Sequence, residues 1–367
     1  MNILFVVNGL GEHDGASKQL VLTANQLSAK GYKVFVHTLA TFKRHKLLHP
    51  DIKHIPPILN IKLRQLQWFT FPFVIRKIAK DNNIDVIISW RTNAGSYSTL
   101  ATLGTNIKTI FCERSDPYME PSNIHAITTY LASLSTGGVF QTPKARDYYK
   151  RLAPKAVVIP NPIDANVELP QIIEYSTRPK EIVFVGRMSI QQKRHDILFR
   201  TMKDIHKVLP EYKLRLYGGG KYIEKIKAMA YEMGLKDIVV FEGIVDNIIE
   251  KIKYSRLMLL TSDYEGIPNV VIEAFQAGVP VVTTDCSPGG CRVLIEDGKN
   301  GFITPFRDYK ATAEKAIELL SDEKLANQFI NNSRTKLQEF SPEIIFQKWD
   351  EYIKYIYNDN ALSCQTK

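Results

Sequence analysis

The chain has 367 residues, of which 44% are hydrophobic and 23% are charged, and this length and composition suffice for two buried cores. The longest uninterrupted apolar runs, such as residues 3–7, are far shorter than the roughly 18 residues of a membrane-spanning helix. The 48 basic and 38 acidic side chains leave a net charge of +10. These numbers predict a basic protein of two domains and exclude a transmembrane helix.

Neither an export signal nor a disulfide framework is expected. The first apolar run has no basic residues before it, and Asn8-Gly9 follows it instead of a small-residue cleavage site. The four cysteines are sparse, and Cys286 and Cys291 have neither a second pair nor nearby histidines to complete a zinc site. We therefore expect reduced thiols, a cytoplasmic location and no bound metal.

Short β-rich runs alternate with helical segments along the first half of the chain. Residues 3–7, 17–30 and 32–39 predict a strand, a helix and a strand, with Gly31 ending the helix. Further strands are predicted at residues 85–90, 107–112, 138–141 and 157–160. Strands separated by helices form a parallel sheet that is covered on both faces.

A second alternating run follows a segment without clear periodicity. Residues 165–180, which include Pro170 and Pro179, predict a linker. A last helix at residues 341–357 has an apolar stripe around Trp349 that must be buried against one domain. The architecture is therefore two doubly wound sheets in series, whose ligands bind at the carboxyl ends of the strands. The strands of the second sheet are predicted at residues 182–185, 213–217, 238–241, 257–260, 280–284 and 302–304.

Most of the excess positive charge lies in the first half, within residues 41–80. This segment has nine basic side chains against the single acid Asp51, and it also contains Phe42, Trp68, Phe69, Phe71 and Phe73. Interleaved cations and aromatics favour an anionic bilayer surface, where each Lys or Arg contributes about 1 kcal/mol. The alternative is that the aromatics belong to the core and the cations to a solvated rim. Nucleic acid is a weaker third option, because no recognition motif accompanies the charge.

Glycines follow the first predicted strand. Asn8-Gly9-Leu10-Gly11 and then Gly15 would let the backbone approach a ligand and leave helix N–H groups aimed at an anion. Their spacing differs from the dinucleotide pattern Gly-x-Gly-x-x-Gly, and no acid follows the second strand, so a dehydrogenase is disfavoured. An ordinary strand-to-helix turn explains these glycines equally well.

Two cations follow the first strand of the second half. Gly186 and Arg187 end that strand, and Lys193 precedes the helical run of residues 196–208. Cations at a strand end near a helix start are placed to neutralise a diphosphate. The alternative is two surface cations among many, and the position at the predicted switch point of the sheet favours the diphosphate.

The most informative segment is residues 262–274, which read Ser-Asp-Tyr-Glu-Gly-Ile-Pro-Asn-Val-Val-Ile-Glu-Ala. Glu265 lies on a loop after a strand, and Glu273 lies in a helix that Pro268 starts. This spacing opposes the facing acid and nucleophile of a glycosidase and suits carboxylates that accept hydrogen bonds from two sets of sugar hydroxyls. An acid near the positive end of a helix is an alternative for Glu273 but does not explain Glu265.

A set of motifs together resembles the retaining nucleotide-sugar glycosyltransferases of family 4: Gly186-Arg187, Lys193, Gly218-Gly219-Gly220, Glu265-x7-Glu273 and Ser287-Pro288-Gly289-Gly290. The resemblance covers most of residues 1–357 and is strongest in the second half. It implies the α/β GT-B fold, in which two doubly wound Rossmann-like domains face an interdomain cleft and a C-terminal helix crosses back to the N-domain. The implied parts are an acceptor-binding domain at residues 1–165, a nucleotide-sugar-binding domain at residues 177–340 and the returning helix at residues 341–358.

The resemblance also implies a role for each site residue. Arg187 and Lys193 would hold the diphosphate, Glu265 would contact hydroxyls of the transferred sugar, and these three are the predicted catalytic residues. Glu273 would bind the ribose. No metal and no cofactor is implied beyond a UDP-sugar as co-substrate. The full donor-binding set is Gly15, Arg114, Gly186, Gly218, Gly266, Ile267, Pro268, Asn269, Val270 and Glu273.

One segment departs from many relatives, which carry a histidine after a strand of the first domain. This chain instead has Cys112-Glu113-Arg114-Ser115-Asp116-Pro117. The pattern is similar to members that build bacterial surface polysaccharides from hexose or N-acetylhexosamine donors. Arg114 would serve the donor or the acceptor, or form a structural ion pair.

The predicted function is retaining, metal-independent transfer of a hexose or N-acetylhexosamine from a UDP-sugar to a lipid-linked or growing glycan, in capsule, O-antigen or exopolysaccharide synthesis. The predicted partners are the donor, the acceptor glycan and an anionic membrane surface through residues 41–80, which places the enzyme at the inner face of the cell membrane; nucleic acid is not expected. Two alternatives remain. A nucleotide-sugar epimerase or hydrolase of the same fold would need no acceptor, and a non-catalytic basic binding protein would bind its ligand without Glu265.

Overall fold

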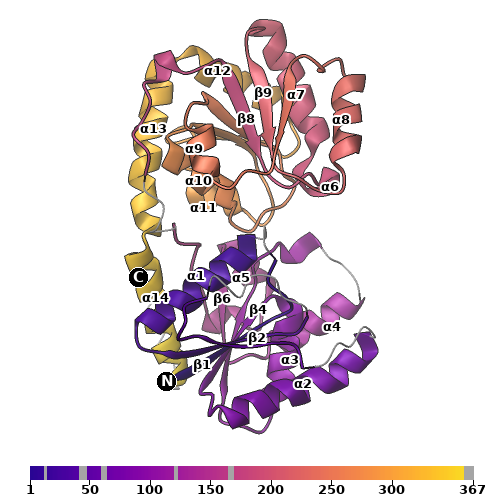
Figure 1. The fold of residues 1–367 in the computed structure, drawn as a ribbon, viewed down its shortest axis with the longest axis vertical. Coiled ribbons are helices and arrows are strands. Elements are labelled where there is room, and N and C mark those ends of the chain that lie inside the picture. Colours follow the sequence, from indigo (N-terminus) through magenta and orange to yellow (C-terminus); the bar gives the residue numbers. More distant parts are fainter. Residues whose placement is uncertain (12–14, 41–47, 59–63, 120–122, 164–168, 359–367) are drawn as a thin grey trace. The chain divides into compact units, whose positions relative to one another are not determined.

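The computed structural model describes residues 1–11, 15–40, 48–58, 64–119, 123–163 and 169–358. The chain divides into two compact units (Figure 1). The first unit comprises Met1–Asp164 together with Pro342–Lys367, and the second comprises Ala165–Ser341. The last part of the sequence therefore packs with the N-terminal sheet and not with the domain that precedes it. No helix in the described part of the chain is both long and apolar enough to cross a bilayer.

The first unit is built on a parallel sheet of seven strands in the order β3-β2-β1-β4-β5-β6-β7. Its interior strand β1 is buried along residues 3–7, as expected of a sheet whose two faces are both covered. The strand bounds are β1 Asn2–Val7, β2 Lys33–Thr38, β3 Lys53–Ile55, β4 Val86–Trp90, β5 Lys108–Cys112, β6 Gly137–Phe140 and β7 Ala156–Val158.

Alternating side chains of β1 belong to two different cores. Ile3 and Phe5 pack with helix α1 (Gly15–Ala29) and helix α14 (Pro342–Tyr357). Leu4 and Val6 pack with α2 (Arg64–Asp81) and α3 (Thr92–Thr102). This alternation is what a strand of period two requires when both faces of its sheet are covered. The unit also contains α4 (Asn123–Ala132) and α5 (Pro143–Tyr148).

Helix α14 is fixed to the first sheet by aromatic and polar contacts. Trp349 stacks on Trp90 of β4 with ring centroids 6.4 Å apart. The Tyr352 hydroxyl accepts a hydrogen bond from the Gly138 N–H at 2.7 Å and donates to the Lys155 carbonyl at 2.5 Å. The predicted return of the C-terminal helix to the N-terminal domain is confirmed, and Figure 1 shows this yellow helix beside the indigo strands.

The second unit is built on six parallel strands in the order β10-β9-β8-β11-β12-β13. The order reverses between β8 and β11, which is the switch point where such sheets bind ligands. The strand bounds are β8 Glu181–Val185, β9 Lys213–Tyr217, β10 Val239–Gly243, β11 Leu257–Leu260, β12 Val281–Thr284 and β13 Phe302–Thr304. The helix bounds are α6 Ile190–Lys193, α7 His195–Val208, α8 Ile223–Glu232, α9 Ile248–Ile252, α10 Asn269–Ala277, α11 Gly290–Leu294, α12 Tyr309–Ser321 and α13 Glu323–Leu337.

The predicted strands are all present, with ends displaced by at most two residues, and the short strand β3 was not predicted. A linker was predicted at residues 165–180, but the described residues at its C-terminal end pack into the second unit. Tyr175 and Arg178 are buried in the second unit, where Arg178 donates to the carbonyls of Ser255 and Gly278 at 3.0 and 2.8 Å. Residues 173–178 are therefore part of the second unit. Residues 164–168 lie outside the described residues.

Candidate functional site

The carboxyl ends of β8 and β11 bring together two of the predicted site residues. Lys193, the last residue of α6, places its Nζ 2.5 Å from Glu265 Oε1 on the loop after β11. The two side chains are only 9% and 11% exposed. Such a pair is held in a medium of lower polarity than water, where an ion pair with good geometry is strong and an unpaired charge is costly. The lysine and the glutamate predicted from separate motifs thus form one charged pair.

Backbone contacts bind the α6 segment to the loop that carries Glu265. The Thr261 hydroxyl donates to the Lys193 carbonyl at 2.9 Å, and the Asp263 N–H donates to the Gln192 carbonyl at 2.8 Å. The Gln192 side chain in turn donates to the Tyr264 carbonyl at 3.2 Å. These bonds fix the position of the lysine relative to the glutamate without using either charged group.

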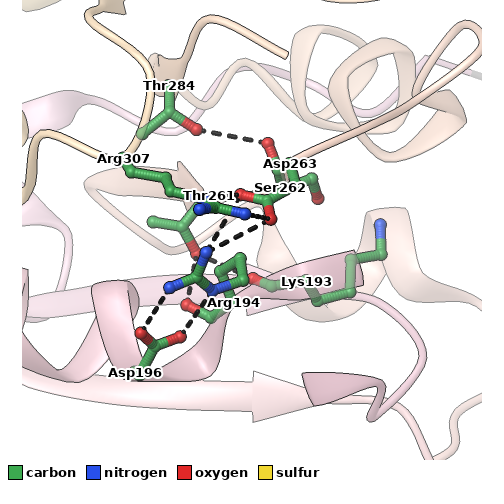
Figure 2. A network of polar contacts seen from close by, with 8 residues as sticks. All are labelled: Lys193, Arg194, Asp196, Thr261, Ser262, Asp263, Thr284 and Arg307. Carbon is green, nitrogen blue, oxygen red and sulfur yellow. Dashed lines mark hydrogen bonds and ion pairs between the residues drawn. The ribbon is translucent and has the colours of Figure 1, made fainter. Parts of the chain in front are cut away.

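A second group of charged residues begins next to Lys193 in the sequence and is drawn in Figure 2. The buried Asp263 carboxylate accepts hydrogen bonds from Arg307 at 2.9 and 2.5 Å and from Arg194 at 3.4 and 3.2 Å. Arg194 also donates to both oxygens of Asp196, at 2.9 and 2.7 Å. The chain Asp196–Arg194–Asp263–Arg307 therefore links the start of α7, the end of β11 and the segment after β13. We call these four residues the Asp263 network.

Two members of the Asp263 network have left-handed backbone conformations. Arg194 has φ of 49° and Arg307 has φ of 59°, a region that non-glycine residues rarely adopt. Hydrogen bonds to Asp196 and then to Asp263 raise the pKa of Arg194, and the hydrogen bond to Asp263 raises the pKa of Arg307. Strained residues persist where their surroundings over-determine them, so the network holds α6 and the Glu265 loop at a defined spacing.

Glycines allow three loops to meet at this edge of the sheet. A Cβ on Gly218, whose φ is 132°, would lie 1.9 Å from the Gly186 carbonyl oxygen. A Cβ on Gly290 would lie 1.5 Å from the Gly266 carbonyl oxygen. Gly186 itself faces the end of the Lys193 side chain, since its Cβ would lie 3.1 Å from Cε. The glycines after β9 and β12 are therefore required by close backbone packing, whereas a side chain at Gly186 would press on the end of Lys193.

The loop after β11 continues directly into α10. The Glu265 N–H donates to the Ser287 carbonyl at 2.8 Å, which joins this loop to the one after β12. Pro268 is the N-cap of α10 and supplies no side-chain cap, which leaves the start of the helix for other acceptors. Ile267 and Pro268 are buried, whereas Gly266, Asn269, Val270 and Glu273 are half-buried along the same loop and the first turns of α10.

The remaining predicted cation is arranged differently from Lys193. Arg187 follows β8 and is exposed, and its Nη2 lies 3.4 Å from the Gln192 side-chain oxygen. Gln192 is thus shared by Arg187 and the Glu265 loop. An exposed guanidinium with one long hydrogen bond is free to reorient toward an anion more readily than the buried lysine.

A buried histidine lies beside the charged pair. His195 is fully buried at the start of α7 and packs edge-on against Phe184, with ring centroids 5.0 Å apart. Burial, and then the positive charge of Lys193, lower its pKa to about 4. His195 is therefore neutral at pH 7 and adds no positive charge that would repel Lys193.

Two predicted donor residues, Gly15 and Arg114, belong to the first unit. Gly15 is exposed at the start of α1. The Arg114 guanidinium is buried and lies 4.2 Å from the Trp90 ring centroid and 5.7 Å from that of Trp349. Burial lowers the pKa of Arg114. The guanidinium is held by cation–π contacts that join β4 to α14.

The neighbouring Glu113 does not serve as the ion-pair partner of Arg114. Its carboxylate accepts from the hydroxyls of Thr92 at 2.6 Å, Tyr149 at 3.0 Å and Ser115 at 2.8 Å. It also accepts from the Arg114 backbone N–H at 2.9 Å. Hydroxyl and backbone N–H groups thus satisfy the Glu113 carboxylate, while the Arg114 guanidinium lies against the two tryptophan rings.

The described residues contain no group of three or more His, Cys, Asp or Glu side chains that could hold a metal ion. Asp263 and Glu265, which the sequence places two residues apart, each bind cationic side chains of the second unit. The Asp263 network was not predicted. Its only sequence signal is the position of Asp263 at a strand end beside Glu265, and nothing in the sequence marks Arg307.

Comparisons with known proteins place both halves of the chain among glycosyltransferases. Residues 13–167 match the family described as Glycosyltransferase Family 4, and residues 168–336 match the family described as Glycosyl transferases group 1. One relative is the Campylobacter jejuni protein named GalNAc-alpha-(1->4)-GalNAc-alpha-(1->3)-diNAcBac-PP-undecaprenol alpha-1,4-N-acetyl-D-galactosaminyltransferase, 23% identical over 98% of this chain and 99% of its own length. Another, the Escherichia coli O-antigen biosynthesis glycosyltransferase WbnH, is 29% identical over 67% of this chain and 74% of its own.

The fold is shared with solved structures. Anabaena HepE in complex with UDP-glucose superposes with a TM-score of 0.81 at 20% identity, over 96% of this chain and 99% of that one. Two parallel Rossmann-like sheets of seven and six strands, with this likeness, define the GT-B fold, and the predicted fold class is confirmed. The two sequence matches together span residues 13–336. The chain belongs to glycosyltransferase family 4.

Proposed function

We propose that the protein is a retaining, metal-independent hexosyltransferase that moves a hexose or N-acetylhexosamine from a UDP-sugar to a lipid-linked or growing glycan in surface polysaccharide synthesis. The observation that carries the proposal is the buried pair of Lys193 and Glu265 at the switch point of the second sheet. A lysine and a carboxylate at this edge match two neighbouring parts of a nucleotide sugar, which are the anionic diphosphate and the polar sugar bonded to it.

Lys193 and Arg187 bind the diphosphate in this proposal. The ammonium group has three N–H donors, of which one is directed at Glu265, so the others are available to phosphate oxygens. The exposed Arg187 adds a planar group that binds phosphate in a bidentate manner. The start of α10, which has no side-chain cap, adds the positive end of a helix dipole.

The chemistry follows from where charge develops. The bond between sugar C1 and the β-phosphate oxygen breaks, and its electron pair leaves with UDP. The acceptor hydroxyl oxygen forms the new bond to C1 from the same face, which retains the configuration, and its proton passes to a phosphate oxygen. Lys193, Arg187 and the N-terminus of α10 stabilise the negative charge on UDP, so this mechanism requires no metal.

The sugar and the nucleoside use the remaining predicted residues. Glu265 accepts hydrogen bonds from hydroxyls of the transferred sugar, and Glu273 accepts those of the ribose. Backbone N–H groups of residues 266–270 contact the sugar and phosphate, and the glycines after β8 and β9 permit close approach. Gly15 and Arg114 contribute to donor binding from the first unit.

The relatives support the choice of substrates. HepE is solved with UDP-glucose, and the names of the Campylobacter jejuni and Escherichia coli proteins refer to an undecaprenol-linked glycan and to O-antigen biosynthesis. We infer a UDP-sugar donor and a membrane lipid-linked acceptor for this chain, which is expected to act at the cytoplasmic face of the cell membrane. The reaction is a transfer, in contrast to the epimerase and hydrolase alternatives.

Thermal unfolding in the presence of nucleotides tests the donor site. UDP, GDP, UDP-glucose, UDP-galactose and their N-acetylamino forms are compared, because a ligand at 100 times its Kd adds about 2.7 kcal/mol of stability. We expect stabilisation by UDP and by one UDP-sugar, and its loss in Lys193→Ala. Lys225→Ala, which changes an exposed lysine of the same unit, is the matched control. No stabilisation by any nucleotide would reject the donor site.

Product analysis with that UDP-sugar then distinguishes the alternatives. A polyprenyl diphosphate-linked glycan is supplied or withheld, and UDP release and sugar transfer are both measured. Transfer that requires the acceptor supports the proposal. Full turnover without it indicates an epimerase or hydrolase. No turnover by the parent protein with or without acceptor, together with ligand binding that survives Glu265→Ala, indicates a binding protein.

A further inference from the structure

Helix α2 has an exposed apolar stripe in its first half. Phe71 and Ile75 are buried in the core of the first unit, and Trp68 is half-buried against Tyr97. Phe69 and Phe73, by contrast, are 71% and 73% exposed. The aromatics of α2 therefore divide between core and surface, and Phe42 of the same basic segment lies outside the described residues. Large aromatics exposed to this degree indicate a surface that is covered in use.

The same stripe becomes basic in the second half of the helix. Leu66, Phe69 and Phe73 are followed by the exposed Lys77 and Lys80, at spacings of three and four residues that place them on one side of a helix. Arg76 is also exposed and donates to the Leu103 carbonyl at 3.2 Å, so it is tied to the end of α3. The helix thus presents an apolar patch with lysines at one end.

Helix α4 presents a second apolar patch. Its sequence from Asn123 to Ala132 contains no charged residue, and Ile124, Ile127 and Tyr130 are exposed. Helix α3 packs against both α2 and α4. In Figure 1 the three helices lie on the same side of the first unit, away from α1 and α14. We call the exposed side chains of α2 and α4 the α2–α4 surface.

We propose that the α2–α4 surface docks the protein on an anionic lipid bilayer. Phe69, Phe73 and Leu66, together with the isoleucines of α4, enter the interface between headgroups and acyl chains, while Lys77 and Lys80 pair with lipid phosphates. This inference names the surface through which the proposed enzyme would reach a lipid-linked acceptor, and in that respect it rests on the proposed function. The docking itself involves no sugar and can be tested separately.

Charge complementarity selects a bilayer over a protein partner. The exposed cations near the end of α2 are Arg76, Lys77 and Lys80, against the single acid Asp81, so this end of the helix attracts an anionic surface. Exposed aromatics on a cationic helix that does not span the membrane are typical of helices that lie in the bilayer interface. An acidic protein groove would satisfy the lysines of α2 but would not require the uncharged, apolar face of α4.

Vesicle co-sedimentation tests the proposal in the absence of nucleotide sugar. Vesicles of phosphatidylcholine with phosphatidylglycerol are compared with vesicles of phosphatidylcholine alone. We expect binding to the anionic vesicles to weaken about tenfold or more in the double variant Phe69→Gln/Phe73→Gln. The double variant Lys77→Gln/Lys80→Gln is expected to weaken binding about fivefold or more, and high salt should remove that difference.

The control exchanges two similarly exposed apolar side chains of the second unit, Val208→Gln/Tyr231→Gln, and is expected to bind as the parent protein does. Circular dichroism confirms that each variant is folded. No binding of the parent protein to anionic vesicles would overturn the proposal, and so would equal binding by the phenylalanine variant. Because these measurements need neither donor nor acceptor, a negative result leaves the transferase assignment standing, and failed nucleotide binding leaves the docking surface standing.

Discussion

The two Rossmann-like units share a topology but use the carboxyl ends of their strands differently. In the second unit this edge carries charged pairs: Lys193 with Glu265, and Asp263 with two arginines. In the first unit the corresponding edge has Arg114 stacked on two tryptophans, and the neighbouring Glu113 is satisfied by hydroxyls. Ion pairs therefore hold the loops at this edge in the second unit, whereas aromatic packing holds Arg114 at the same edge of the first unit.

Under the proposed function, this difference separates donor binding from attachment to the membrane. A rigid polar site suits a donor of fixed chemistry, because a diphosphate and a sugar demand charges at defined positions. The first unit instead exposes apolar helices on its surface, which suits an acceptor attached to a lipid. Substitutions in the second unit should therefore affect catalysis and ion-pair energetics, whereas those in the first should affect packing and attachment.

The largest effect is expected at Glu265. Glu265→Ala removes the carboxylate that we propose contacts the transferred sugar, and it leaves Lys193 without its partner. We expect the transfer rate at saturating donor to fall about 100- to 1,000-fold. Initial rates of sugar transfer measure this, with Glu296→Ala as the control for an exposed, ion-paired glutamate of the same unit. If Glu265→Ala transferred sugar at the parent rate, Glu265 would have no role in catalysis and the proposed site in the second unit would be rejected.

The next largest effect is expected in the Asp263 network. Asp263→Asn leaves Arg194 and Arg307 without a buried counter-charge, and breaking a buried pair of this kind costs about 3 kcal/mol of unfolding free energy. Because the network holds α6 against the Glu265 loop, transfer should fall about tenfold as well. Urea unfolding and transfer rates are measured together.

The control for this substitution is Asp285→Asn, which breaks the more exposed pair with Arg292 and should cost less than about 1 kcal/mol. Equal losses in the two variants would show that the network does not differ from an ordinary surface ion pair. The buried pair of Lys193 and Glu265 would then be the remaining ion pair that distinguishes the strand ends of the second unit from those of the first.

A third effect depends on pH. Burial lowers the pKa of His195 to about 4, whereas the unfolded chain has the ordinary value of about 6.5. Between these values the unfolded state binds more protons, so stability is lost as the pH falls from about 6.5 to about 4. His195→Leu should remove this loss, which amounts to about 2 kcal/mol between pH 7 and pH 5.

Urea unfolding at these two pH values measures the effect, and the exposed His49→Gln serves as control. If His195→Leu showed the same pH dependence as the parent protein, the acid sensitivity would lie in other groups. His37 of the first unit, whose pKa is also lowered by burial, would then be the next residue to change.

The sequence predicted the two sheets because fully buried parallel strands read as short apolar runs between helices. It also predicted Lys193 and Glu265, since cations and carboxylates at strand ends carry a chemical meaning. It did not predict their direct pairing, because the contact spans 72 residues and depends on how α6 meets the β11 loop. Strand β3 was missed because Lys53 and His54 give a short edge strand no apolar signature. The left-handed conformations of Arg194 and Arg307 were equally hidden, since arginine carries no preference for that region.

The smallest effect is expected at Arg114, where the two units are compared most directly. Arg114→Lys keeps the charge but loses the flat stacking on Trp90 and Trp349, which should lower the unfolding free energy by about 1 kcal/mol. The stabilisation by UDP-sugar should persist in Arg114→Lys and decrease in Arg114→Gln, because only the first retains a cation for the donor. Urea unfolding measures the packing role of Arg114, and the thermal shift with UDP-sugar measures its role in donor binding. Equal stabilisation of both variants by UDP-sugar would assign Arg114 to packing alone and confine donor binding to the second unit, since Lys193 and Glu265 would then suffice.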